Sequence, residues 1–324
     1  MPWLRWLLPL GTTHNLIRTL EPRMPPTPPS LTAADFDPEV LRLFDQYVHG
    51  RLDRRGFLDR AARHAAAAGT TATGLLAALS PDFARAQKVS PTDARVKSEF
   101  IEFASPAGNG KVRALVARPA QATGPLPVVL TIHENRGLNP HIKDIARRLA
   151  LDNFIAVAPD ALFTQGGYPG DEDKARELFG KLDRKKTSED FVAAAHYART
   201  LAGGNGKLGA TGFCWGGGMV NLIATRVPEL AAGAPFYGVA APLREVGAIK
   251  AELLLVFADN DEFVNGTWPP YEAALKQAGV RFAAHKYPGA EHGFNNDTTP
   301  RFNEAAAKLA WGRTFALFNR TLRG

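Results

Sequence analysis

GATGFCWGGGMV, residues 209–220, contains the only cysteine of the 324-residue chain. Cys214 is the centre of the pentapeptide GFCWG, which follows a short apolar run and precedes a segment with helical spacing. This is the pattern G-x-S-x-G with sulfur in place of oxygen, in which a strained turn between a strand and a helix exposes a nucleophile. The glycines leave room for strand and helix to pass closely, and the start of a helix favours a thiolate. The stretch therefore predicts a strand, a sharp turn and a helix, with Cys214 as the nucleophile.

Two other interpretations of Cys214 stay open on this stretch alone. A free cysteine is often a small buried hydrophobic residue without a chemical role. A dinucleotide-binding loop fits less well, because Cys214 stands where the second glycine must let the pyrophosphate approach, and no acidic residue ends the next strand at the usual distance. A nucleophile needs a base and a group that orients the base, so the rest of the chain has to supply both.

Around this stretch, short apolar runs alternate with segments of helical period. A predicted hairpin comes first, with strands at 95–105 and 110–119. The apolar runs, typical of strands covered on both faces, are 126–133, 153–160, 206–212, 231–238, 251–259 and 280–288. The predicted helices are 140–151, 171–182, 187–202, 217–227, 268–278 and 302–320. This order predicts an α/β fold with a mostly parallel sheet and helices on both faces, formed as a single domain by residues 90–324.

The ends of the predicted strands supply the missing acid and base. In such a sheet the chemistry gathers at the carboxyl ends of the strands. The loop ADNDEFV has a register that selects Asp261 over Asp259 as the acid, and the loop PGAEHGF presents His292. Nucleophile, acid and histidine then follow in the chain order of α/β-hydrolases. We expect His285, in a predicted strand, and His196, in a predicted helix, to have structural or surface roles.

With these three residues in this order, residues 95–320 resemble the dienelactone hydrolases, also called carboxymethylenebutenolidases. The resemblance rests on GFCWGG, DNDEFV, AEHGF and the segment HENRGLN after the first long strand. Most α/β-hydrolases use serine, whereas this family uses cysteine. The resemblance implies the α/β-hydrolase fold and the hydrolysis of a small-molecule ester or lactone through a thioester, with no cofactor.

The resemblance also implies roles for residues in HENRGLN and in the turn. It assigns Glu134 to contact with the resting cysteine, and the backbone N–H groups of Asn135 and Trp215 to the oxyanion hole. A carboxylate beside the thiol would keep the sulfur protonated until substrate displaces it. Without the resemblance, Glu134 would be taken for a loop carboxylate paired with Arg136.

The sequence departs from the family at the substrate end. In the family, an arginine shortly after the catalytic histidine holds the substrate carboxylate, and the corresponding position here is Asn296. Arg176 is the nearest candidate for a second family arginine, and Arg301 or Arg136 could take its place. The class of reaction therefore transfers more securely than the substrate does.

Composition agrees with a globular enzyme and excludes several other classes. Hydrophobic residues make up 45% and charged residues 22% of the chain. The net charge of +7 comes from 39 basic residues interleaved with 32 acidic ones, without the basic and aromatic runs of a nucleic-acid surface. One cysteine excludes an intrachain disulfide framework, and the absence of HExxH leaves no metal site to predict.

Residues 1–89 are predicted to be a leader. The segment 21–38 is too rich in proline for a helical core, and WLRWLLPL before it is too short to span a bilayer. Next come Arg54 and Arg55, a mildly apolar stretch, and Ala-Arg-Ala before Gln87. This order resembles a twin-arginine export signal cleaved near Ala86 and Gln87. It implies contact with the twin-arginine machinery, a periplasmic or secreted product, and no stable membrane insertion after processing.

Three alternatives remain. The alanine-rich part of the leader could be an amphipathic helix that belongs to the fold, and Met24 could be the true start. At the level of function, the chain could be a non-catalytic exported protein on a hydrolase scaffold, with Cys214 as a redox sensor. Turnover of an activated ester separates that possibility from an enzyme.

Overall fold

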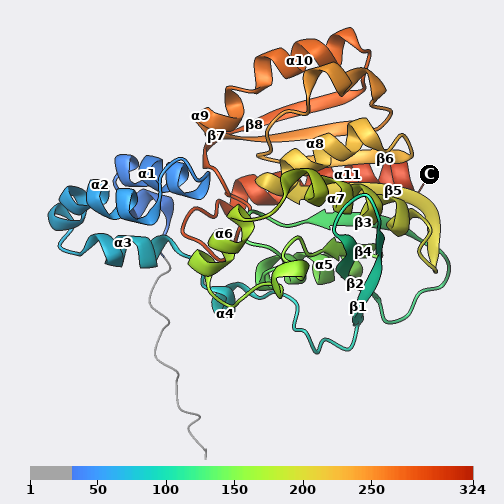
Figure 1. Ribbon diagram of the computed structural model, residues 1–324, viewed down its shortest axis with the longest axis horizontal. Coiled ribbons are helices and arrows are strands. Elements are labelled where there is room, and N and C mark those ends of the chain that lie inside the picture. The colour runs from blue at the N-terminus through green and yellow to red at the C-terminus, as the bar shows by residue number, and fades with distance from the viewer. Residues whose placement is uncertain (1–30, 324) are drawn as a thin grey trace, which may run out of the picture. The chain divides into compact units, whose positions relative to one another are not determined.

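The computed structural model describes residues 31–323, and its strands form one eight-stranded sheet (Figure 1). The strands lie in the order β1-β2-β4-β3-β5-β6-β7-β8. β1 pairs antiparallel with β2 and β2 antiparallel with β4, whereas the pairs from β4 to β8 are parallel. The strand bounds are β1 Val96–Ser105, β2 Gly110–Pro119, β3 Leu126–Ile132, β4 Ile155–Pro159, β5 Gly204–Phe213, β6 Leu230–Phe236, β7 Glu252–Asn260 and β8 Phe282–Glu291.

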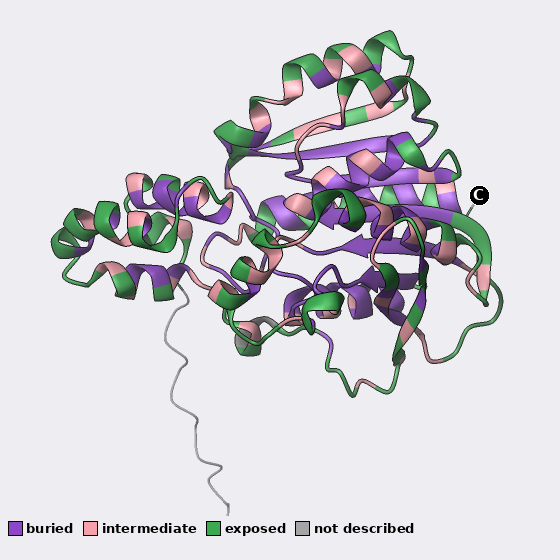
Figure 2. Cartoon of the chain, in the orientation of Figure 1, coloured by how far each residue is buried: buried purple, intermediate pink, exposed green. Residues whose placement is uncertain are grey.

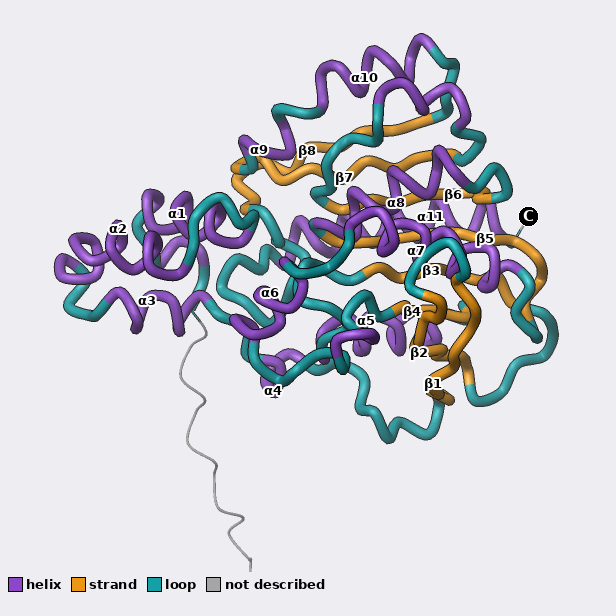
Figure 3. Tube along the Cα trace, in the orientation of Figure 1, coloured by secondary structure: helices purple, strands orange, loops and turns teal. Residues whose placement is uncertain are grey.

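Helices cover both faces of the sheet (Figures 1 and 3). Buried side chains of α7 (Arg184–Arg199), α8 (Trp215–Arg226) and α10 (Trp268–Gln277) belong to the core on one face. Those of α5 (Pro140–Leu151) and α11 (Glu304–Leu322) belong to the core on the other. Every residue of β4 is buried, and Figure 2 shows the central strands in purple almost throughout, as expected for strands covered twice.

The sequence-based predictions for the sheet and the helices that cover it are confirmed. The hairpin and the six apolar runs become the eight strands, and the helix predicted at 140–151 has those bounds. The helix predicted from residue 187 begins at Arg184, because the Asp183 side chain accepts hydrogen bonds from the first free N–H groups, those of Lys185 and Lys186. Likewise, Asp171 caps α6 (Glu172–Gly180).

The largest difference from expectation lies in residues 31–86, which fold as helices. They are α1 (Pro38–Val48), α2 (Arg54–Ala67), α3 (Ala72–Leu79) and the short α4 (Phe83–Ala86). We call residues 33–79 the N-terminal helical unit. Its own apolar core is formed by side chains from all three longer helices, among them Leu43, Phe57 and Leu79. Amphipathic spacing in α1 explains this core, because the buried residues recur every three or four positions along one face.

The residues assigned to an export signal have structural roles in this unit. Arg54 and Arg55 begin α2, behind Asp53, whose carboxylate accepts the N–H of Gly56 at 2.7 Å. The mildly apolar stretch 65–80 forms the end of α2 and α3, and it buries Leu75 and two further leucines. These residues are therefore helical in the structure. Cleavage near Ala86 and export stay predictions. None of the helices in residues 31–323 is long and apolar enough to cross a bilayer.

Candidate active site

Cys214 occupies a strained turn between β5 and α8. Its backbone has φ 56° and ψ −117°, a conformation that L-residues rarely adopt. Strain of this kind costs on the order of 1–3 kcal/mol and persists only where the surroundings impose it. Its N–H donates to the carbonyl oxygen of Phe236 at 3.1 Å, which ties the turn to the end of β6. The turn thus holds the sulfur at the carboxyl end of the parallel sheet.

The two glycines that flank the cysteine permit this turn sterically. A Cβ on Gly212 would lie 2.3 Å from the carbonyl oxygen of Gly216. A Cβ on Gly216 would lie 2.4 Å from the carbonyl oxygen of Ile132, at the end of β3. These atoms are backbone and have little freedom to give way. The glycine pattern quoted from the sequence therefore reflects the close passage of β5, α8 and β3.

Asp261 and His292 meet behind the cysteine, although two helices and β8 separate them in the chain. His292 Nδ1 lies 2.6 Å from Asp261 Oδ2, and both side chains are almost completely buried. Asp261 also caps α9 (Glu262–Asn265) by accepting the N–H of Val264 at 3.0 Å, which fixes its carboxylate. Asp259 is exposed and accepts the N–H of Gly289 instead. The structure thus brings Asp261, and not Asp259, to the histidine.

The charges around His292 favour its protonated form. Burial lowers the pKa of this imidazole, but the negative charges of Asp261 and Cys214 outweigh burial and hold the pKa well above its usual value. A ring nitrogen of His292 lies within 4.8 Å of Cys214 Sγ. Since Nδ1 faces Asp261, Nε2 is the nitrogen left for the sulfur. This arrangement suits an imidazolium paired with a thiolate.

A cavity of about 350 Å³ opens beside the sulfur. Cys214, His292 and Glu134 all line it, together with Asn296. Asn296 Nδ2 donates to Glu134 Oε2 at 3.2 Å, so the glutamate predicted to guard the thiol is held at the cavity wall. The predicted residues Glu134, Asn296 and His292 are therefore brought together around the nucleophile.

Of the two residues predicted to form an oxyanion hole, Asn135 lines the same cavity and Trp215 directly follows Cys214 in the chain. Trp215 is the first residue of α8, where N–H groups have no partner within the helix. The indole of Trp215 stacks on the ring of His133 at 5.4 Å between centroids. Asn135 donates from its side chain to the carbonyl oxygen of Val48 at 2.7 Å and accepts from Arg136 Nη1 at 2.6 Å. These contacts fix both residues at the ends of β3 and β5.

The arginines proposed for substrate binding separate into two groups. Arg136 and Arg301 line the cavity and are both buried. Arg136 Nε lies 3.7 Å from Glu172, whereas Arg301 donates to the carbonyl oxygen of His292 at 2.7 Å. Arg176 instead donates to the carbonyl oxygen of Tyr47 at 3.0 Å and stacks over its ring. Arg176 thus holds α1 in place, and only the other two contact the cavity.

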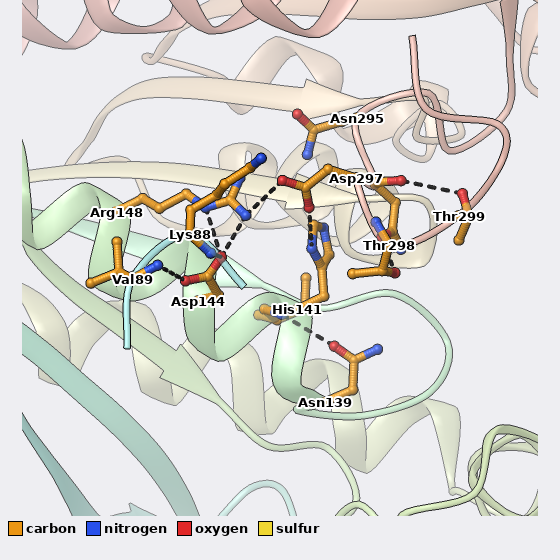
Figure 4. Close-up of polar contacts among 12 residues, drawn as sticks. Lys88, Val89, Asn139, His141, Asp144, Arg148, Asn295, Asp297, Thr298 and Thr299 are labelled. Carbon is orange, nitrogen blue, oxygen red and sulfur yellow. Dashed lines mark hydrogen bonds and ion pairs between the residues drawn. The ribbon is translucent and has the colours of Figure 1, made fainter. Parts of the chain in front are cut away.

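A buried network anchors the loop that follows His292 (Figure 4). Asp297 lies between Arg148 Nη2, at 2.7 Å, and His141 Nδ1, at 3.3 Å, both from α5. Burial by itself raises the pKa of Asp297. The hydrogen bond from His141 and the charge of Arg148 outweigh burial, so the pKa is lowered overall. In the same network, Asp144 accepts the N–H of Val89 at 2.8 Å. The network thus joins the loop after His292 and the segment after α4 to α5.

Sequence reasoning missed the residues that α1 brings to the site. The ring of His49 lies 4.3 Å, between centroids, from the ring of His292. Its Nδ1 lies 2.9 Å from the main-chain oxygen of Asp45 and 3.2 Å from the carboxylate of the same residue. The amphipathic pattern after Asp37 and Pro38 is a usable helix signal, but no local pattern reveals which surface that helix covers.

These side chains also form the groups, within residues 31–323, that could hold a metal ion. The ligand atoms of His49, Cys214 and His292 lie within 4.8 Å of one another, and so do those of Asp45, His49, Asp261 and His292. Nitrogen and sulfur donors of the first group would suit zinc. An ion there would bind the sulfur that the turn presents. The hydrogen bond between His292 and Asp261 fits an acid–base pair as well as it fits a metal site.

Comparisons with known protein families match two separate parts of the chain. Residues 112–322 match the Dienelactone hydrolase family. Residues 28–66, which include α1 and most of α2, match a YqhI-like family.

Individual relatives point the same way. A putative carboxymethylenebutenolidase of Escherichia coli K12 is 32% identical over 268 residues, which cover 78% of this chain and 97% of the relative. The putative hydrolase fragment YghX of the same organism is 48% identical over 113 residues, or 35% of this chain and 97% of the fragment. Among solved structures, a putative dienelactone hydrolase from Klebsiella pneumoniae matches with a TM-score of 0.61 and 30% identity, over 69% of this chain and 99% of its own.

Proposed function

The chain belongs to the dienelactone hydrolase family, whose members are carboxylic ester and lactone hydrolases, and we propose that it acts through Cys214 as a covalent nucleophile. The observation that carries the proposal is the convergence of Cys214, His292 and Asp261 beside one cavity from three strand ends. A nucleophile, a histidine beside it and an acid that orients the histidine are the requirements of covalent acyl transfer.

The first half of the reaction forms a thioester. The thiolate of Cys214, paired with the His292 imidazolium, attacks the carbonyl carbon of the ester. The backbone N–H groups of Trp215 and Asn135 stabilise the oxyanion that develops, and a donor of this kind is worth about 3 kcal/mol. The tetrahedral intermediate then collapses, the C–O bond breaks, and the alcohol leaves with a proton from an imidazolium of the site.

The second half returns the free enzyme. Water attacks the thioester carbonyl and gives a proton to the imidazole that was deprotonated in the first half. Collapse of this second intermediate expels the thiolate and releases the carboxylic acid. Proton transfer by a positioned imidazole contributes on the order of 10²- to 10⁴-fold. A thiolate leaves readily, so the route suits activated esters such as enol lactones.

Glu134 has a separate role in this proposal. Its carboxylate, held at the cavity wall by Asn296, accepts a hydrogen bond from the Cys214 thiol in the resting enzyme, which keeps the sulfur protonated and unreactive. Substrate displaces the carboxylate, which takes the thiol proton with it and leaves the thiolate. Glu134→Gln removes this control, so we expect the pH profile of Cys214 alkylation by iodoacetamide to change. An unchanged profile would remove the role of Glu134 while leaving the nucleophile in place.

The cavity supports a small ester or lactone as the substrate. Buried cationic side chains of Arg136 and Arg301 could hold an acidic group on that substrate. Arg301 is the better candidate, because its guanidinium contacts a main-chain oxygen and an aromatic face, whereas Arg136 already lies near the carboxylate of Glu172. Turnover of a panel of lactones and esters, with and without a carboxylate, by the wild type and by Arg301→Gln tests this assignment.

The decisive experiment for the nucleophile is Cys214→Ala. This substitution should abolish turnover of p-nitrophenyl acetate and of dienelactone and leave the melting temperature nearly unchanged. Persistent turnover would refute the proposal. The competing function, a redox sensor on a hydrolase scaffold, predicts an oxidisable thiol and no turnover by the wild type, so the same assay separates the two.

A further inference from the structure

We infer that His49, supplied by the N-terminal helical unit, is a second proton-transfer histidine of this active site, which protonates the leaving alcohol and then deprotonates the attacking water. The inference rests on the proposed function, because it needs the thioester route through Cys214. It goes beyond it by assigning a reacting group to a segment outside the hydrolase fold.

The position of His49 is the first observation. A ring nitrogen of His49, Cys214 Sγ and a ring nitrogen of His292 lie within 4.8 Å of one another. The His49 side chain is only 6% exposed, and its Nε2 is buried without a hydrogen-bond partner among the described residues. An unpaired polar atom at such a depth is costly and calls for an explanation such as a catalytic role. Nδ1 is occupied by the main-chain oxygen of Asp45, so Nε2 is the ring nitrogen left without a partner.

The N-terminal helical unit is fixed firmly enough to place this side chain. The carbonyl oxygens of Tyr47 and Val48, directly before His49, accept hydrogen bonds from Arg176 and Asn135. The Tyr47 hydroxyl and Arg54 both bind Asp173. Orphan carbonyls at the end of α1 are thus satisfied by the hydrolase fold. The last turn of α1 therefore has one defined position over the site.

Charged and titratable groups face His49 from its own helix and from the hydrolase fold. From its own helix it faces Asp45, and from the hydrolase fold it faces Asp261, Cys214 and His292. Arg51 lies 3.6 Å from Asp45, and Arg301 acts on the same carboxylate from the loop after His292. Burial by itself raises the pKa of Asp45. His49 and His292 outweigh burial, so the pKa is lowered overall and the carboxylate stays ionised.

The protons balance with His49 in this role. In acylation, the thiolate forms the C–S bond, the C–O bond breaks, and its electron pair takes the proton from His49 Nε2 to give the free alcohol. In deacylation, water forms the new C–O bond and returns a proton to His49, while the C–S bond breaks and its electron pair returns to the sulfur. His292 keeps its proton throughout and stabilises the thiolate at both ends of the cycle.

This division of labour follows from the environment of His292. Its pKa is held well above the usual value by Asp261 and Cys214, despite burial. A group that holds its proton so tightly is poorly matched to proton transfer near neutral pH. It is well matched to pairing with a thiolate. A second imidazole that does not share Asp261 removes this conflict.

The inference has a consequence for the predicted export signal. His49 and the helix that carries it precede the predicted cleavage position near Ala86, so a working enzyme must retain them. A cleaved leader would remove the second histidine. N-terminal sequencing of the protein from its natural host reads this directly, and a mature form that begins near Gln87 and is fully active would contradict our inference.

The closing experiment varies the leaving group. We compare kcat/KM of the full chain for p-nitrophenyl acetate, whose leaving group needs little protonation, with that for phenyl acetate, whose leaving group needs it. His49→Gln should lower turnover of phenyl acetate on the order of a hundredfold and of p-nitrophenyl acetate by a few-fold. His49→Asn keeps an amide near the position of Nδ1, lacks Nε2, and should behave in the same way.

His64→Gln is the matched control. His64 Nδ1 lies 2.7 Å from Asp37 within the same helical unit, so this variant also breaks a histidine–aspartate pair, yet away from Cys214. It should leave both rates unchanged. Equal losses on both esters, or none, in the His49 variants with normal alkylation of Cys214 would overturn the inference alone. Undiminished turnover by Cys214→Ala would overturn the proposed function as well.

Discussion

Replacing Asp261 with Asn tests the geometry of the site most directly. The carboxylate lies 2.6 Å from His292 Nδ1, and no part of the Asp261 side chain is exposed to solvent. Asparagine has the same shape but no charge, so it cannot hold the proton on Nδ1 of the His292 imidazolium as the carboxylate does. The substitution also removes one of the two charges that raise the pKa of His292.

The expected magnitude follows from these contacts. Loss of the orienting acid in a nucleophile–histidine–acid arrangement costs on the order of 10⁴-fold in kcat. At about 1.36 kcal/mol for each factor of ten, this is roughly 5.5 kcal/mol of transition-state stabilisation. Part of this is the buried charged hydrogen bond itself, which contributes about 1.5–3 kcal/mol. The remainder comes from the misplaced proton on His292.

The assay is steady-state hydrolysis of p-nitrophenyl acetate, with Asp259→Asn as the matched control. Asp259 lies in the same loop and is exposed, and its carboxylate accepts the N–H of Gly289 at 3.3 Å. Asp259→Asn should keep nearly full activity. A loss of less than about tenfold in Asp261→Asn, or a larger loss in Asp259→Asn, would refute the assignment of the acid and the reasoning from buried geometry.

Three further predictions concern the scaffold. Gly216→Ala should destabilise the protein, because its Cβ would meet backbone oxygens at 2.4 and 2.5 Å, whereas Gly312→Ala, with open space around it in α11, should stabilise it by about 0.5–1 kcal/mol in urea unfolding. Asp297→Asn should cost about 3 kcal/mol at pH 7. Because folding lowers the pKa of Asp297, its contribution is present above about pH 4 and is lost as pH falls through the lowered pKa, so the cost should shrink at pH 3; an equal cost at both would contradict this. Val48→Ala enlarges the cavity and should raise the hexanoate-to-acetate rate ratio for p-nitrophenyl esters roughly tenfold. Val40→Ala, in the core of the same helix, should not change that ratio.

Most of the hydrolase fold could be predicted from sequence because its signals are local. Continuous apolar runs indicated doubly covered strands, and their alternation with helical periods indicated a parallel sheet. The turn around Cys214 was readable because two glycines and a nucleophile at fixed spacing solve one steric problem. The N-terminal helical unit was less readable, since proline, alanine and paired arginine are shared by export signals and helix starts. Asp37 followed by Pro38 was the overlooked helix signal.

By itself, the sequence determined which residue types reach the strand ends and in what order: nucleophile, acid and histidine. The tertiary structure alone decided what covers the cavity and which side chain of α1 lies beside the nucleophile. The burial of Asp261 at the end of β7 agrees with the register of its loop, whereas His49 reached Cys214 across 165 positions of the chain by the docking of α1. Such contacts depend on how whole helices and strands pack against one another, and a pattern of neighbouring residues does not encode that packing.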